Sequence, residues 1–298
     1  MEVLRTPEER FSHLPDYPFK PHYHELPGEY EGLRFHCIDE GPHEAEHIFL
    51  CLHGEPTWGY LYRKMIPVFI QAGHRVVAPD FFGFGRSDKP VDEAVYTFDF
   101  HRMSIAAFIE RLDLRNITLV CQDWGGLIGL TLPMDMPDRF SRFLIMNTML
   151  GTGDEPLSKG FLAWRTWNNK HPDMAVGKLI GRACPHLSEA ECAAHDAPFP
   201  DATYKAGVRR FPNIVPDRVD APGAPISRRA RIWLRAIWAG QTFMAVGIRD
   251  PVLGPPVMDR LKEIIRGCPE PYEMHEAGHF VQEWGREVAE RALESFEG

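Results

Sequence analysis

The sequence is short of positive charge and of long apolar runs. Its 298 residues include 33 Lys and Arg against 42 Asp and Glu, a formal net charge of -9. Because nucleic-acid binding needs clustered Lys and Arg, this balance argues against a nucleic-acid partner. No run approaches membrane-spanning length, and residues 1–5 lack the apolar core of a signal peptide. We therefore expect a cytoplasmic protein with no membrane partner.

Cysteine is also sparse, and its spacing excludes two common uses. The six cysteines are scattered, and three of them lie in or beside apolar, strand-like runs. This spacing fits neither a disulfide framework nor a metal site, so we interpret these residues as small buried hydrophobic side chains. Internal repeats and low-complexity segments are missing too. The composition, 44% hydrophobic and 25% charged, is that of a globular protein with a sizeable core.

Short apolar runs bounded by turn residues are the main pattern that is present. They predict strands at residues 47–52, 75–78, 117–121, 142–146, 242–246 and 273–274. Helical periodicity lies between most of them, for example at 98–112 and 257–265. This alternation predicts an α/β fold, a mostly parallel sheet with helices on both faces. Active sites in such sheets lie beyond the carboxyl ends of the strands.

One long interruption divides the pattern. After the strand that ends near residue 146, the next core strand begins only at 242, and residues 152–226 are rich in Trp, Pro and Ala. We interpret this stretch as an inserted helical cap over the strand ends. The predicted organisation is a core of residues 1–151 and 227–298 that is interrupted by a cap at 152–226.

The most informative segment is Ile117-Thr-Leu-Val-Cys-Gln-Asp123-Trp-Gly-Gly-Leu-Ile-Gly-Leu130. A β-branched strand enters a tight turn and leaves it directly as a helix, with small residues two positions either side of Asp123. This is the pattern of the nucleophile elbow of an α/β-hydrolase fold, with a carboxylate where serine usually stands. The competing interpretation makes Asp123 a simple helix N-cap, a common use of Asp.

Two further segments supply the remaining catalytic parts. The loop 53–58, after an early strand, would provide the backbone N–H of Glu55 to an oxyanion hole, and Trp124 would provide the second N–H. His279 follows the last strand, where this architecture places its base. Asp250 follows the preceding strand and completes the chain order nucleophile, acid, base. The alternative position after residue 146 offers Asn147 and Thr148, which cannot carry the charge.

A zinc-protease pattern overlaps the proposed base. Residues 275–279 read His-Glu-Ala-Gly-His, which matches the His-Glu-x-x-His motif. That chemistry needs both histidines on one face of a helix. Here the segment follows a short strand and Gly278 weakens a helix, so the triad interpretation is favoured and no metal or cofactor is expected.

A carboxylate nucleophile limits the reactions that this site could catalyse. Ionised Asp123 can displace a leaving group from saturated carbon and form an alkyl ester. Water activated by His279 would then hydrolyse that ester, with Asp250 stabilising the imidazolium. The substrate must therefore carry a halide or a strained epoxide oxygen.

Across nearly its whole length the sequence resembles the haloalkane dehalogenases, in the subgroup whose acid follows the seventh core strand. The segments that carry the resemblance are His53-Gly-Glu-Pro-Thr-Trp58, Asp80-Phe-Phe-Gly-Phe-Gly-Arg-Ser-Asp-Lys-Pro90, Gln122-Asp-Trp-Gly-Gly126 and Gly278-His-Phe-Val-Gln282. Some of these are shared with epoxide hydrolases. The resemblance implies a haloalkane substrate and a halide product.

The resemblance also assigns a halide site and a substrate pocket. It implies that two indole N–H groups hold the halide, one from Trp124 and one from Trp164 in the cap, with Trp167 as a rival for the second. Indole suits this role because it donates without accepting. The pocket positions implied by the family are Phe161, Phe211, Pro212, Val252, Leu253 and, where the family commonly has an aromatic residue, Leu127. The connection 150–160 is also shorter than in the best-known member.

Other functions remain open from the residues alone. An epoxide hydrolase would use two cap tyrosines as acids, but the cap contains only Tyr204. A fluoroacetate dehalogenase needs arginines beside the nucleophile, where Trp124-Gly-Gly126 stands instead. A serine esterase would need a Ser at a nucleophile elbow, and no Ser occupies such a position. A non-catalytic binding protein on this fold would typically lack a triad member. The sequence further predicts a monomer, since no unpaired amphipathic element is evident.

Overall fold

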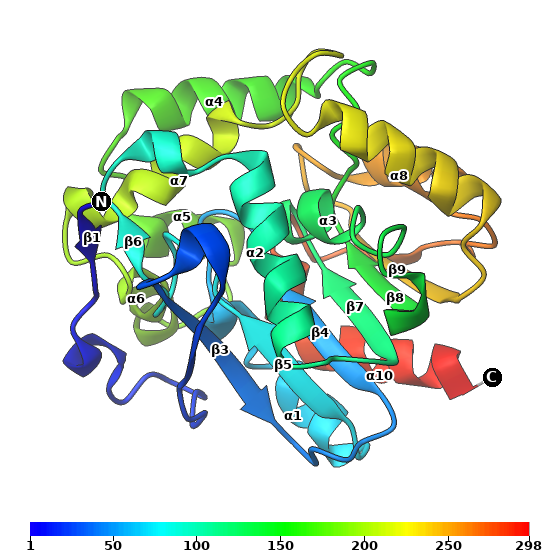
Figure 1. The fold of residues 1–298 in the computed structure, drawn as a ribbon, viewed down its shortest axis with the longest axis horizontal. Coiled ribbons are helices and arrows are strands. Elements are labelled where there is room, and N and C mark those ends of the chain that lie inside the picture. The colour runs from blue at the N-terminus through cyan, green and yellow to red at the C-terminus, as the bar shows by residue number, and fades with distance from the viewer. Residues whose placement is uncertain (298) are drawn as a thin grey trace.

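The structure is a computed structural model that describes residues 1–297, and its centre is a mostly parallel sheet (Figure 1). Within those residues eight strands pair in the order β10-β9-β8-β7-β4-β5-β3-β2. The pairs β2–β3 and β3–β5 are antiparallel, and the other pairs of this sheet are parallel. The bounds are β2 His22–Glu25, β3 Arg34–Glu40, β4 Ile48–Leu52, β5 Arg75–Pro79, β7 Ile117–Cys121, β8 Phe140–Met146, β9 Gln241–Gly247 and β10 Tyr272–Met274; the short strands β1 Val3–Leu4 and β6 Lys89–Pro90 pair separately.

All six strands predicted from apolar runs are present, within two residues at each end. The prediction missed β2 and β3, whose sequences His-Tyr-His-Glu and Arg-Phe-His-Cys-Ile-Asp-Glu mix apolar and charged residues. β2 is the edge strand and is partly exposed, whereas β3 lies between β5 and β2 and is buried from Phe35 to Ile38. Polar and charged residues in both strands interrupt the continuous apolar run that marks a central strand.

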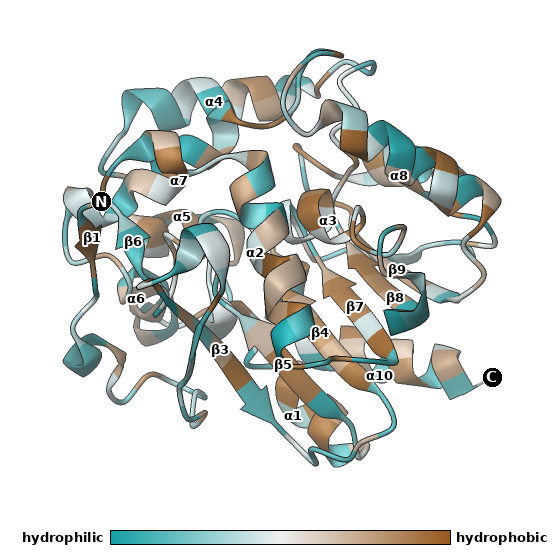
Figure 2. Cartoon of the chain, viewed as in Figure 1, coloured by the Kyte–Doolittle hydropathy of each residue, from teal (hydrophilic) through white to brown (hydrophobic). Residues whose placement is uncertain are grey.

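Helices cover both faces of the sheet, as the strand pattern predicts. On one face, strand residues such as Leu50 and Leu119 pack with α2 (Phe98–Arg111), α3 (Trp124–Gly129), α8 (Ala224–Ala236) and α9 (Pro255–Ile264). On the other, Phe49 and Val120 pack with α1 (Ile66–Gln71) and α10 (Gly285–Glu297). Figure 2 shows the central strands as hydrophobic along their length.

The long segment between β8 and β9 forms helices that extend across one end of the sheet (Figure 1). They are α4 (Lys159–Lys170), α5 (Val176–Ala183), α6 (Glu189–Asp196) and α7 (Ala206–Arg210), followed by α8. The predicted cap boundary at residue 226 falls inside α8, whose Ala230 and Leu234 pack into the core. No helix in residues 1–297 has the length and apolar character that a membrane span would require.

A buried carboxylate organises the loop that follows β5. Asp80 is fully buried, and one of its oxygens lies 2.7 Å from His36 Nδ1 on β3. It also accepts backbone hydrogen bonds from Gly59 and Arg86, each at 2.7 Å. These contacts join β3, the loop after β4 and the loop after β5, so Asp80 holds together the segments that border the site.

Replacing Asp80 with Ala should destabilise the protein by about 3–5 kcal/mol, because buried partners lose their acceptor. Urea unfolding measures this change in the free energy of unfolding. Asp259→Ala, at an exposed position of α9, is the matched control and should change it by less than about 0.5 kcal/mol. Equal losses in the two variants would contradict the role given to Asp80.

Candidate active site

Asp123 stands on a strained turn between β7 and α3. Its backbone has φ 50° and ψ −123°, a conformation that non-glycine residues rarely adopt. The turn is held by a hydrogen bond from Asp123 N to Asn147 O (2.9 Å) and by one from Thr148 Oγ1 to Asp123 O (2.7 Å). Any Cβ at Gly125 would overlap the backbone carbonyl of Leu52, so glycine is required at this position, where the elbow pattern predicts a small residue.

The Asp123 side chain points into the site and does not cap the helix. It makes no capping hydrogen bond to α3. Instead, Asp123 Oδ1 accepts a 2.8 Å hydrogen bond from the backbone N–H of Glu55, in the loop after β4. Asp123 Oδ2 lies 3.7 Å from His279 Nε2. This geometry favours the nucleophile interpretation over the N-cap interpretation.

His279 and Asp250 form the second half of the constellation. Their loops follow β10 and β9, which are neighbours in the sheet, so parallel pairing brings the two side chains together. His279 Nδ1 lies 2.8 Å from Asp250 Oδ2. Asp250 also accepts hydrogen bonds from Asn147 Nδ2 (2.9 Å) and from the backbone N–H of Val252 (2.7 Å). The imidazole therefore stands between two carboxylates.

Two polar residues of this site were missed by sequence reasoning. Asn147, considered only as a site for the acid, instead orients Asp250 and also bonds the backbone of Gly247. The Gln122 side-chain amide lies 2.9 Å from His279 Nε2. Its position directly before Asp123, at the end of a buried strand, is the one signal that could have indicated a role.

The pKa values of the three ionisable groups follow from their surroundings. Burial raises the pKa of Asp123 above its ordinary value, although His279 and the N–H groups of Glu55 and Trp124 oppose this. Burial alone would raise the pKa of Asp250, but His279, Asn147 and the Val252 N–H outweigh burial and lower the pKa. Burial alone would lower the pKa of His279, but the charges of Asp250 and Asp123 outweigh burial and raise the pKa to about 9.

These groups open onto an apolar cavity of about 200 Å³ between the strand ends and the inserted helices. Its wall contains Asp123, His279, Asp250 and the two indoles of Trp124 and Trp164. The other lining residues are Glu55, Pro56, Leu127, Met149, Phe161, Leu179, Ala183, Pro212, Val215, Pro251, Val252, Leu253 and Phe280. Five of the six pocket residues expected from the resemblance are among them.

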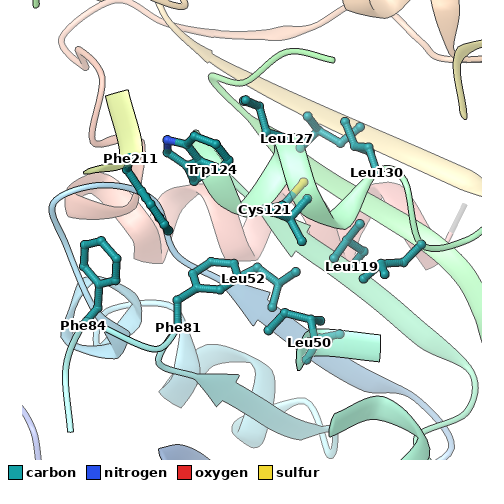
Figure 3. Packing of buried hydrophobic residues seen from close by; sticks show 14 of the residues in the cluster. Leu50, Leu52, Phe81, Phe84, Leu119, Cys121, Trp124, Leu127, Leu130 and Phe211 are labelled. Atoms are coloured by element: carbon teal, nitrogen blue, oxygen red, sulfur yellow. The ribbon is translucent and has the colours of Figure 1, made fainter. Parts of the chain in front are cut away.

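The sixth, Phe211, lies behind the wall. It is fully buried, and its ring is 4.5 Å from that of Trp124, against which it packs (Figure 3). The sequence indicated an apolar position near the site but not on which side of the indole it lies. Leu179 and Ala183, which do line the cavity, come from α5 and were not predicted.

The two candidate indoles of the inserted segment occupy different places. Trp164 lines the cavity, whereas Trp167 stacks on Trp164 at a ring distance of 5.5 Å and on His171 at 4.3 Å. Trp167 therefore lies one layer further from the nucleophile. This placement favours Trp164 as the partner of Trp124.

The zinc-like pattern does not assemble a metal site. Residues 275–279 form a turn after β10, and the side chain of His275 is 73% exposed while that of His279 is 15% exposed. In the part of the chain that the structure describes, no group of three or more His, Cys, Asp and Glu residues is arranged to hold a metal ion. The two histidines thus face different surroundings.

The fold and the arrangement of Asp123, Asp250 and His279 define an α/β-hydrolase. Residues 47–286 match the family model described as the alpha/beta hydrolase fold. The chain is 45% identical to a haloalkane dehalogenase of Psychrobacter cryohalolentis, over 99% of this chain and 98% of that protein. It is 44% identical to haloalkane dehalogenase 1 of Mycobacterium tuberculosis, over 98% of each chain.

A solved structure is similar as well. The haloalkane dehalogenase DpaA of Paraglaciecola agarilytica, described as tetrameric, is 53% identical and superposes with a TM-score of 0.97 over 99% of both chains. The chain therefore belongs to the haloalkane dehalogenases, hydrolases that act on carbon–halide bonds.

Replacing Gly125 with Ala should destabilise the protein by about 1–3 kcal/mol or more, because the added Cβ meets the Leu52 carbonyl, which is backbone and cannot move aside. Thermal or urea unfolding measures the loss. Gly278→Ala is the control, since its Cβ would meet only Arg249 O at 4.0 Å. A stable, active Gly125→Ala protein would contradict the close packing at the elbow.

Proposed function

We propose that the chain hydrolyses short haloalkanes through an alkyl ester on Asp123. The observation that carries this proposal is that one apolar cavity is lined by the carboxylate, the imidazole and both indole rings. A cavity of about 200 Å³ is suited to a small apolar molecule, since a dry cavity of about 150 Å³ can hold benzene. Residues 152–226 would act as the cap that closes it.

The first step forms the ester and releases the halide. Asp123 Oδ1 is held by the Glu55 N–H, so Oδ2 is the oxygen that would attack the carbon bearing the halogen. The C–O bond forms as the carbon–halogen bond breaks, and the electron pair of that bond leaves with the halide. The indole N–H groups of Trp124 and Trp164 would receive the anion, because they donate hydrogen bonds from an otherwise apolar wall.

The second step hydrolyses the ester. Esterification removes the negative charge of Asp123, one of the two charges that raise the pKa of His279, so that pKa falls and the imidazole can accept a proton. Water then adds to the Asp123 carbonyl carbon, and the alcohol departs with Oδ2. The overall products are alcohol, halide and a proton.

The oxyanion of the second step would be stabilised by backbone donors. The Glu55 N–H already lies 2.8 Å from Asp123 Oδ1, the atom on which negative charge develops. The Trp124 N–H lowers the pKa of the same carboxyl and would act as the second donor. One such donor typically contributes about 3–4 kcal/mol to the transition state.

Replacing His279 with Gln should stop the reaction at the alkyl-enzyme. Turnover should fall by about 10²–10⁴-fold or more, because the water loses its base. Mass spectrometry after incubation with 1-bromobutane should show one butyl group added to the protein, and bromide release should stop after one equivalent. Asp123→Ala is the control and should gain no mass and release no bromide.

The same assay separates the alternative functions. Wild-type protein should release bromide and protons from 1,2-dibromoethane and 1-bromobutane. Diol from styrene oxide without any bromide would instead indicate an epoxide hydrolase. The geometry argues against that outcome, because the wall of the cavity is lined by Trp, Phe and aliphatic residues, and Tyr204 lies on a short 3-10 helix outside that lining. Inactivity toward both would favour a non-catalytic binding protein.

Replacing Trp164 with Phe should weaken bromide binding by roughly tenfold or more, because one hydrogen bond to an anion is lost. Quenching of tryptophan fluorescence by bromide measures the affinity, with Trp124 as a reporter. Trp167→Phe is the matched control, since Trp167 stacks outside the cavity. The assignment is wrong if Trp167→Phe is the variant that loses affinity.

Oligomeric state and location are separate proposals. The likeness to tetrameric DpaA favours a tetramer over the monomer predicted from the sequence, and light scattering on the purified protein decides between them. A cytoplasmic location and the independence of turnover from metal or cofactor stay predictions. Dialysis against a chelator should leave bromide release unchanged.

A further inference from the structure

The Glu55 side chain is a buried acid that the reaction above leaves unused. The mechanism needs only its backbone N–H, yet the residue is part of the cavity wall together with both indoles. Glu55 is 5% exposed, and within residues 1–297 its buried Oε1 has no hydrogen-bond partner. Ionising a buried carboxyl that has an oxygen without a donor is costly, so the structure favours a neutral acid beside the two indoles.

The charged groups around Glu55 do not offset the negative charge that it would carry when ionised. The turn after β7 contributes Asp123, and the loops after β9 and β10 contribute Asp250 and His279, which are already paired with each other at 2.8 Å. Helix α4 contributes the Trp164 indole, and α5 contributes Leu179 and Ala183. The cations of these two helices lie elsewhere: Arg165 pairs with Asp217, and Lys159, Lys170, Lys178 and Arg182 are exposed.

Two carboxyls that border one apolar cavity cannot both ionise cheaply. Asp123 has the backbone N–H of Glu55 and the facing imidazole to stabilise its charge. Burial and the charge of Asp123 raise the pKa of Glu55 well above its ordinary value, and the nearby Trp164 indole N–H only partly opposes this. Glu55 is therefore the member of the pair that keeps its proton.

We propose that the Glu55 carboxyl is a proton-linked part of the halide site, so that halide binds while Glu55 is protonated and is expelled when Glu55 ionises. This inference rests on the proposed halide site between Trp124 and Trp164. A protonated Glu55 offers an O–H donor to an anion and competes weakly for the Trp164 N–H. An ionised Glu55 would accept the Trp164 N–H itself, so that this donor is lost to the halide, and its negative charge would repel the halide.

The proton link gives the reaction a route for product release. Each turnover leaves a halide and a proton in a cavity whose wall is mostly apolar. Loss of the Glu55 proton to solvent would convert a neutral neighbour of the halide into an anion. Halide affinity should then fall as pH rises through the pKa of Glu55.

Bromide quenching of tryptophan fluorescence, measured from neutral to alkaline pH, tests this link in wild type and in Glu55→Gln. Gln has the shape of the protonated acid but no proton to lose. In wild type the dissociation constant should rise by up to about tenfold per pH unit, the limit for one linked proton. In Glu55→Gln only the part of this rise that comes from His279 should remain, and in the double variant Glu55→Gln/His279→Gln the dissociation constant should stay constant.

His279→Gln is the control for the other group that titrates in this range, since the pKa of His279 is about 9. The pH dependence should persist in this variant. Calorimetry of bromide binding to it, in buffers of different ionisation enthalpy, should show uptake of up to one proton at alkaline pH. This measurement tests the link between halide and proton even if the Glu55→Gln protein does not fold.

The outcomes separate the two proposals. Absence of quenching in wild type at every pH would overturn the halide site itself. Quenching with a pH-independent affinity, a slope that survives in Glu55→Gln/His279→Gln, or bromide binding to His279→Gln without proton uptake would overturn the role of Glu55 and leave the halide site intact.

Discussion

The buried carboxylate of Asp123 is the group on which the rest of the site depends. In the proposed reaction it must be ionised to attack carbon, yet it lines an apolar cavity, and burial raises its pKa. The fold compensates with the Glu55 N–H, the Trp124 N–H and the His279 imidazole, which come from three separate loops. Because all three must converge on one carboxylate, the turn, the sheet register and the loops cannot vary independently.

The carboxyl groups around the cavity are chemically alike, and their surroundings give them different pKa values. Asp250 receives an amide from Asn147 and a backbone N–H from Val252, so it stays ionised beside His279. Glu55 has neither and lies near the charge of Asp123, so its pKa is high. In the proposed reaction, these different pKa values would let one cavity hold a nucleophile, an orienting acid and a neutral acid.

The apolar wall opposite the strand ends depends on a second buried charge. Arg63 is buried and pairs with Glu283, in the 3-10 helix Val281–Trp284 that follows His279, and with Glu191 on α6, both at 2.8 Å. Trp58 Nε1 also donates to Ala194 O of α6 at 3.2 Å. Removing one partner of a buried pair typically costs about 3–5 kcal/mol, so the inserted helices are fixed to the core close to the base.

By itself the sequence determined the central strands, the elbow at Asp123 and the places of Asp250 and His279 after the last two strands, because these rest on local periodicity and turn chemistry. The strands β2 and β3 escaped prediction, since their polar and charged residues interrupt the apolar pattern. Only the tertiary structure decided that Trp164 faces the cavity, that Phe211 lies behind Trp124 and that Asn147 holds Asp250. Such facts depend on which face of an element meets a distant segment, and long-range packing sets that face.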